Sequence, residues 1–180
     1  VDTTGQRTRN LILIGFMGTG KTTIGKQVAK SLGLEFVDTD ALIARKAGKS
    51  IPDIFEEDGE KVFRRFETEV LRECVGKTDQ VISTGGGIVT QPENSPLLEE
   101  GGYVVWLRAE AETIFERVRR NKHRPLLQVD DPLGTIRGLL EIRDPLYEQA
   151  QNLSIRTDEL TMDETCYGVT ETARLMLGLE

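Results

Sequence analysis

The chain has 180 residues, of which 38% are hydrophobic and 29% charged, and its net charge is −7. This composition is ordinary for one globular domain, and the negative charge argues against a general nucleic-acid surface or an anionic-membrane surface. No apolar run approaches the ~20 residues of a membrane span and no secretory signal peptide is recognisable, so we expect a cytoplasmic protein without a membrane or nucleic-acid partner. We expect residues 1–9 to form a disordered tail and residues 10–180 to form a single domain that is a monomer.

Strand-like and helix-like segments alternate along the chain, which favours an α/β fold with a mainly parallel sheet. The expected strands are Leu11–Gly15, Glu35–Asp38, Gln80–Ser83, Tyr103–Leu107 and Leu153–Arg156. The expected helices are Lys21–Leu32, Ala41–Ala47, Ile51–Asp58, Glu60–Cys74, Ala111–Arg120, Leu133–Tyr147 and Glu164–Leu177. The segment 121–131 is basic first and acidic later, and we expect it to be a mobile surface loop.

The segment from Gly15 to Thr22 fits the phosphate-binding pattern Gly-x-x-x-x-Gly-Lys-[Ser/Thr]. An apolar run precedes it, and a helical pattern with apolar residues four apart follows it, as the motif requires. Glycines allow backbone N–H groups to point at an anion, the Lys21 side chain adds positive charge for the β- and γ-phosphates, and the Thr22 hydroxyl is a ligand for Mg²⁺. We therefore predict a nucleoside triphosphate site. Its expected residues are Gly18, Thr19, Gly20, Lys21, Thr22 and Thr23.

Polar or glycine-rich residues also follow the next two expected strands. Asp38 and Asp40 follow the second strand, where one carboxylate would serve the Mg²⁺ shell and the other would accept a hydrogen bond from a substrate hydroxyl. The alternative is that Asp40 only caps a helix beginning at Ala41. Gly85–Gly87 follows the third strand, either as a place where backbone N–H groups approach a ligand or as a tight turn. All these segments should meet at the carboxyl edge of the sheet, where ligands of open α/β sheets bind.

Several arginines are candidates for binding anionic substrate groups, since the guanidinium offers planar, paired donors for carboxylate and phosphate oxygens. Arg64 lies in Phe-Arg-Arg-Phe-Glu, Arg124 in the suspected mobile loop, and Arg143 in Arg-Asp-Pro-Leu-Tyr. Taken singly, each is more often a surface charge. One of Arg117, Arg119 and Arg120 is a candidate for stacking on an adenine ring, while the others form a solvated helix face.

Taken in order, the phosphate loop, Asp-x-Asp, Phe-Arg-x-x-Glu, Thr-Gly-Gly-Gly, Arg-Pro-Leu-Leu and Arg-x-Pro-x-Tyr resemble the shikimate kinase family from about Leu11 to Leu177. The resemblance implies a three-layer P-loop NTPase fold of the nucleoside-monophosphate-kinase type, with a five-stranded parallel sheet flanked by helices and a lid near 121–131. It also implies transfer of the ATP γ-phosphate to the 3-hydroxyl of shikimate, giving shikimate 3-phosphate in aromatic amino-acid biosynthesis, with Mg²⁺ as the metal.

The resemblance also implies a role for each matching residue. Lys21 and Thr22 would handle the phosphates and Mg²⁺, with Asp38 near the metal. Asp40 would bind shikimate hydroxyls and is the candidate catalytic base. Arg64 and Arg143 would clamp the shikimate carboxylate, and Gly85, Gly86 and Gly87 would line the same site. Arg124 would move with the lid toward the transferring phosphate, and Arg120 matches the adenine-stacking arginine.

Three other functions remain open. A gluconate kinase of the same fold would need a similar set of arginines, and only a panel of substrates separates it from a shikimate kinase. A GTP-dependent switch would need Asn-Lys-x-Asp, whereas Asn121 and Lys122 are followed by Arg124 at the required aspartate, so we count the partial match as chance. A regulator without catalysis would not need the acceptor residues Asp40, Arg64 and Arg143.

Overall fold

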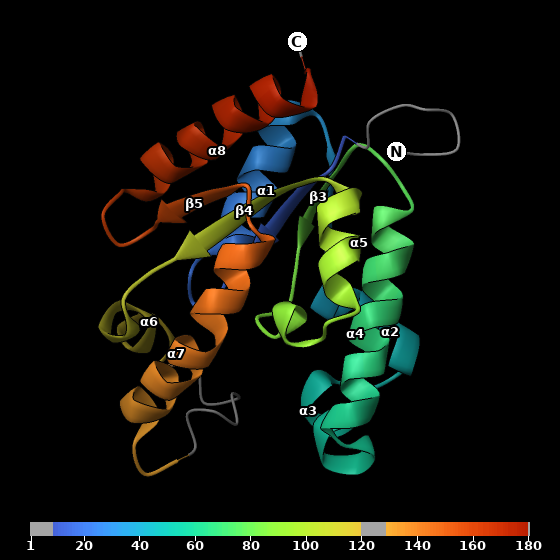
Figure 1. Cartoon of the computed structure of the whole chain (residues 1–180), viewed down its shortest axis with the longest axis vertical. Helices are drawn as coiled ribbons and strands as arrows, with labels where there is room; N and C mark the ends of the chain where they lie inside the picture. Colours follow the sequence, from blue (N-terminus) through green and yellow to red (C-terminus); the bar gives the residue numbers. More distant parts are fainter. Residues whose placement is uncertain (1–8, 120–128, 180) are drawn as a thin grey trace.

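A five-stranded sheet forms the centre of the computed structural model, which describes residues 9–119 and 129–179. Its strand order is β2-β3-β1-β4-β5, and every neighbouring pair is parallel (Figure 1). The strands are β1 (Leu11–Ile14), β2 (Glu35–Asp38), β3 (Gln80–Ser83), β4 (Tyr103–Arg108) and β5 (Leu153–Arg156). Because β1 lies between β3 and β4, the loop that follows it opens at the middle of the carboxyl edge, where such sheets bind ligands.

Helices cover both faces of the sheet. They are α1 (Lys21–Leu32), α2 (Thr39–Ala47), α3 (Ile51–Asp53), α4 (Glu60–Val75), α5 (Asn94–Gly101), α6 (Ala111–Val118), α7 (Pro132–Ala150) and α8 (Met162–Leu177). Shorter helical segments are the π-helical η1 (Ile54–Asp58) and the 3₁₀ turn η2 (Ile88–Thr90). The α/β fold with helices on both faces of a parallel sheet, predicted from the alternating pattern, is confirmed.

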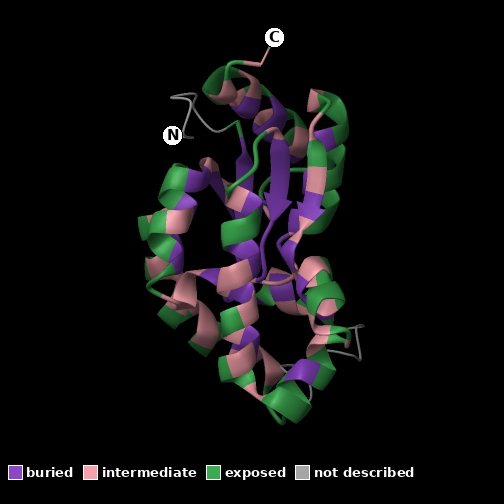
Figure 2. Ribbon diagram, turned by 90° about the vertical axis from the view of Figure 1, so that its right-hand side faces the viewer, coloured by how far each residue is buried: buried purple, intermediate pink, exposed green. Residues whose placement is uncertain are grey.

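Alternating side chains of β1 divide the core into two layers. Ile12 and Ile14 pack with residues of α2, α4, α5 and α7, while Leu11 and Leu13 pack with residues of α1 and α8. All four β1 residues are fully buried, as Figure 2 shows for the central strands. A strand covered on both faces must be apolar throughout, which explains the continuous apolar run before the glycine loop.

Most expected elements form, although some boundaries differ. β2, β3, β5 and α1 have the predicted bounds, and α1 ends at Gly33 with a left-handed backbone. The segment predicted as one helix over Ile51–Asp58 begins at a Ser50 cap but continues as the π-helical η1. Helix α5 was not predicted, because its short sequence contains a proline and its stability comes from burial of residues such as Leu98.

Besides residue 180, two ranges of the chain lie outside the described residues, 1–8 and 120–128. The expected tail falls largely in the first, and most of the expected lid falls in the second, so both stay predictions. Within residues 9–119 and 129–179, no helix combines the length and apolar character needed to cross a bilayer.

Candidate active site

The loop between β1 and α1 has the backbone of an anion cradle. Gly15, Gly18 and Gly20 all have positive φ angles, of 135°, 77° and 95°. Side chains rarely tolerate these conformations, and a Cβ on Gly15 would also overlap the carbonyl of Leu107. Glycine at these positions therefore lets the loop curl ahead of the N-terminus of α1, whose backbone N–H groups favour an anion.

The Lys21 side chain folds back over this loop. Its Nζ donates to the carbonyl oxygens of Gly15 at 2.6 Å and Phe16 at 2.8 Å, and the Thr19 hydroxyl also donates to Phe16, at 2.8 Å. These bonds hold the loop in shape and keep the ammonium group beside it. The predicted phosphate loop thus has both the glycine conformations and the positive charge that a polyphosphate requires.

Asp38 joins the phosphate loop to helix α2. Its Oδ2 accepts from the Thr22 hydroxyl at 3.2 Å, and its Oδ1 accepts from the backbone N–H groups of Asp40 at 3.0 Å and Ala41 at 3.3 Å. The hydroxyl and carboxylate oxygens fit the hard, oxygen-preferring Mg²⁺, which usually keeps several waters and takes few protein ligands. Within the described ranges no three His, Cys, Asp or Glu residues gather as a metal cage.

The alternative role of Asp40 as a helix cap is wrong. Asp40 does not cap α2; Asp38 does, because α2 begins at Thr39 rather than at Ala41. Asp40 instead lies in the first turn of α2. Asp38 therefore turns toward Thr22, while the Asp40 carboxylate lies against Gly85.

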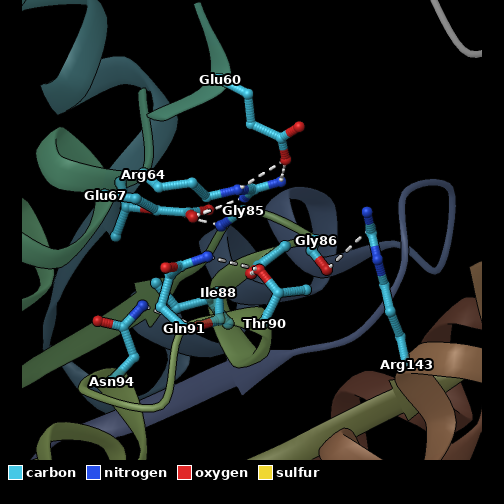
Figure 3. A network of polar contacts seen from close by, with 12 residues as sticks. Glu60, Arg64, Glu67, Gly85, Gly86, Ile88, Thr90, Gln91, Asn94 and Arg143 are labelled. Atoms are coloured by element: carbon cyan, nitrogen blue, oxygen red, sulfur yellow. Dashed lines mark hydrogen bonds and ion pairs between the residues drawn. The ribbon is translucent and has the colours of Figure 1, made fainter. Parts of the chain in front are cut away.

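A network of ion pairs holds Arg64 on helix α4 (Figure 3). Its Nη1 donates to Glu67 Oε2 at 2.7 Å, and its Nε and Nη2 donate to Glu60 Oε1 at 3.2 and 3.0 Å. Glu67 is fully buried, which raises its pKa; the Arg64 guanidinium opposes that rise, and the charge of Asp40 adds to it. Glu67 belongs to the Phe-Arg-x-x-Glu motif, but sequence reasoning gave it no role.

The glycine triplet is the place where the acceptor side chains and the phosphate loop meet. A Cβ on Gly85 would lie 2.8 Å from Asp40 Oδ1 and 2.9 Å from Glu67 Oε1, and one on Gly87 would overlap the Arg64 guanidinium. The Gly85 N–H donates to the Thr39 hydroxyl at 3.2 Å. The glycines are therefore needed because charged side chains pack closely against them. The sequence had suggested either an approach of backbone N–H groups to a ligand or a tight turn.

Gly86 connects this acceptor region to the phosphate loop and to α7. A Cβ on Gly86 would lie 3.4 Å from the backbone nitrogen of Met17 and 3.5 Å from the carbonyl oxygen of Gly15. Arg143 reaches the Gly86 carbonyl from α7 at 3.3 Å, and its guanidinium lies 5.5 Å from the centre of the Phe16 ring. Figure 3 shows Arg143 approaching the triplet from the side opposite Arg64.

Among the candidate adenine-stacking arginines, Arg117 is the one that contacts the phosphate loop within the described part of the chain. Its Nη1 donates to the carbonyl oxygen of Gly18 at 3.2 Å and to the Thr157 hydroxyl at 2.9 Å. Arg119 is half exposed and pairs with Glu116 at 2.8 Å. Two predicted residues, Arg120 and Arg124, lie outside the described residues, so the structure describes neither.

Comparison with known proteins agrees with this geometry. The family model described as shikimate kinase matches residues 17–174. A shikimate kinase of Thermodesulfovibrio yellowstonii is 47% identical over 156 residues, which cover 87% of this chain and 90% of the relative. The solved shikimate kinase of Acinetobacter baumannii, in complex with shikimate, has 42% identity and a TM-score of 0.87 over 95% of this chain and 94% of that one. The shikimate kinase of Bacteroides thetaiotaomicron has 33% identity and a TM-score of 0.83, covering 94% of this chain and 98% of that one. The chain belongs to the shikimate kinase family.

Proposed function

We propose that the residues gathered at the carboxyl edge of the sheet transfer the γ-phosphate of ATP, as its Mg²⁺ complex, to the 3-hydroxyl of shikimate. ATP-dependent shikimate kinase activity follows from the family; the role of each residue and the metal is our proposal. The observation that carries this proposal is the glycine triplet. It contacts Asp40, Arg64 and Arg143, and its Gly86 also packs against the phosphate loop. The glycine triplet would therefore border both the nucleotide site and the site for the phosphoryl acceptor.

The phosphate loop would bind the nucleotide. Lys21, already folded over the loop, would contact the β- and γ-phosphates, and residues from Gly18 to Thr23 would supply backbone N–H groups and hydroxyls. Thr22 and Asp38, 3.2 Å apart, would hold Mg²⁺, one directly and the other through water. Bound there, Mg²⁺ would neutralise negative charge that develops on the phosphate oxygens. We assign the adenine face to Arg117 in place of Arg120, because Arg117 contacts Gly18.

The acceptor site would bind a small molecule that has one carboxylate and several hydroxyls. Arg64 and Arg143, on opposite sides of the triplet, provide the paired donors that a carboxylate requires. Gly85, Gly86 and Gly87 would let the ring of the acceptor lie close to the backbone. Shikimate has this combination of groups, and the solved shikimate kinase of Acinetobacter baumannii is a complex with shikimate.

Asp40 would take the proton. Transfer forms a bond between the 3-hydroxyl oxygen and the γ-phosphorus, breaks the bond from that phosphorus to the ADP oxygen, and moves the hydroxyl proton to the Asp40 carboxylate. The charge of Asp40 raises the pKa of the neighbouring Glu67, and the Arg64 guanidinium opposes that rise. Arg124, from the lid, would add positive charge beside the transferring phosphate and exclude water that competes as an acceptor.

The two aspartates give the experiment that tests these roles. Asp40→Asn should lower kcat for shikimate by about 10²- to 10⁴-fold, the range for loss of a general base, with little change in the Mg²⁺ requirement. Asp38→Asn should instead raise the Mg²⁺ concentration needed for half-maximal rate. Equal effects of both variants on Mg²⁺ dependence, or an undiminished kcat in Asp40→Asn, would contradict the assignment.

A further inference from the structure

The carbonyl oxygen of Gly86 accepts two hydrogen bonds from helix α7. One comes from Arg143 Nη1 at 3.3 Å and the other, the shorter, from the Tyr147 hydroxyl. Arg143 and Tyr147 are four residues apart, so they lie on the same face of the helix. Two donors from one helix thus converge on one backbone atom of the glycine triplet.

The position of Tyr147 is tightly determined by its surroundings. The residue is fully buried, and its ring stacks on Trp106 of β4 with centroids 5.6 Å apart and an interplanar angle of 27°. Burial raises the pKa of its phenol, so the hydroxyl keeps its proton and remains a donor. The Gly86 carbonyl is therefore tied to the central sheet through a rigid aromatic side chain.

This bond bears on Arg143 through competition for one acceptor. A carbonyl oxygen has two lone pairs, and here Tyr147 takes one at short range while Arg143 takes the other at the longer distance of 3.3 Å. Without the hydroxyl, the Arg143 guanidinium is the remaining donor to this carbonyl among the described residues, and it would move closer. A guanidinium drawn toward Gly86 presents its remaining N–H groups in a different direction.

We propose that Tyr147 is a positioning residue for the acceptor substrate: it satisfies the Gly86 carbonyl and thereby leaves the Arg143 guanidinium oriented for the shikimate carboxylate. The inference rests on the proposed role of Arg143. It assigns Tyr147 no contact with substrate. It predicts that loss of the Tyr147 hydroxyl weakens shikimate binding and leaves ATP binding intact, even though Gly86 packs against the phosphate loop.

Tyr147→Phe tests this, because phenylalanine keeps the stack on Trp106. We expect the KM for shikimate to rise about tenfold, the effect of one lost hydrogen bond to a binding group, while the KM for ATP and kcat change less than about threefold. Tyr103→Phe is the matched control, since Tyr103 is the first residue of β4 and lies at the amino ends of the strands, away from the site at their carboxyl ends. An unchanged KM for shikimate, or parallel rises for both substrates, would overturn the proposal.

A double-mutant cycle separates a positioning role from a merely structural one. If Tyr147 acts through Arg143, adding Tyr147→Phe to Arg143→Ala should change the KM for shikimate by less than about twofold. A full tenfold further rise would overturn the inference. If Arg143→Ala alone leaves that KM unchanged, the carboxylate assignment fails instead. Should Tyr147→Phe not fold, Trp106→Phe, which loosens the ring but keeps the hydroxyl, should raise the KM for shikimate selectively, and a change in both KM values would count against the proposal.

Discussion

Removing Arg64 should cost the protein both substrate binding and stability, and the two losses can be separated. Arg64 is 12% exposed and forms an ion pair with Glu67, which is 0% exposed. Arg64→Ala would leave the Glu67 carboxylate buried without its guanidinium, a change that typically costs about 3–5 kcal/mol. The same variant would lose one of the proposed partners of the shikimate carboxylate.

The stability loss should depend on pH. Burial already raises the pKa of Glu67, and without Arg64 the main opposing influence disappears, so the pKa rises further. Between the pKa values of the unfolded and folded states, the folded chain binds more protons, and its stability therefore falls as the pH rises. Keeping this carboxyl group protonated costs about 1.4 kcal/mol for each pH unit above the ordinary value of 4.5. Because the wild-type carboxyl group already bears part of this cost, the deficit of Arg64→Ala relative to the wild type should be largest at pH 8, at most about 3–5 kcal/mol, and smaller near pH 5.

Urea unfolding at the two pH values measures this deficit, with fluorescence of the single, buried Trp106 as the probe. Arg65→Ala, which removes an exposed arginine next in the chain, is the control and should change neither stability nor the KM for shikimate. The double variant Arg64→Ala with Glu67→Gln should recover much of the stability at pH 8 but none of the shikimate affinity. A deficit that does not depend on pH, or shikimate affinity that returns with stability, would refute the reasoning.

Three further substitutions test separate parts of the structure. Gly87→Ala should raise the KM for shikimate about tenfold or more without changing the KM for ATP, since its Cβ would overlap the Arg64 guanidinium; unchanged initial-rate kinetics would contradict the packing of the triplet. Gly138→Ala should raise the free energy of unfolding by about 0.5–1 kcal/mol and leave kinetics alone, because this exposed position in α7 has nothing within 4 Å of an added Cβ; a lower Tm would contradict it. Arg117→Ala should raise the KM for ATP about tenfold and leave the KM for shikimate unchanged, whereas the control Arg119→Ala should alter neither; equal effects would remove the adenine assignment.

The local features of the fold were predictable because each has a short-range physical cause. The phosphate loop is recognisable from glycine spacing, and its neighbours from apolar periodicity, so β1 and α1 follow in order. Caps are local as well: Ser50 and Asp131 each accept from a backbone N–H three residues on, as their positions before prolines suggest. The family motifs also predicted that Asp40, Arg64 and Arg143 lie in one site.

Other features depend on contacts between distant segments. Whether Asp38 or Asp40 caps α2 is set by where β2 leaves its partner strand β3, and the last pair in that register is Asp38 with Ser83. The hydrogen bond from Tyr147 to Gly86 spans 61 residues, so helical spacing alone gives no sign of it. Likewise the choice of Arg117 over its neighbours depends on a loop 99 residues away. No local pattern encodes these partners.

The most direct test of the central claim is ADP formation from ATP and Mg²⁺, with and without shikimate, with the product followed by mass spectrometry and gluconate tested in parallel. The account predicts shikimate 3-phosphate in step with ADP, little turnover without shikimate or with gluconate, and none in Lys21→Met. ADP formation that does not depend on shikimate, or turnover retained in Lys21→Met, would contradict the placement of the acceptor site beside the phosphate loop.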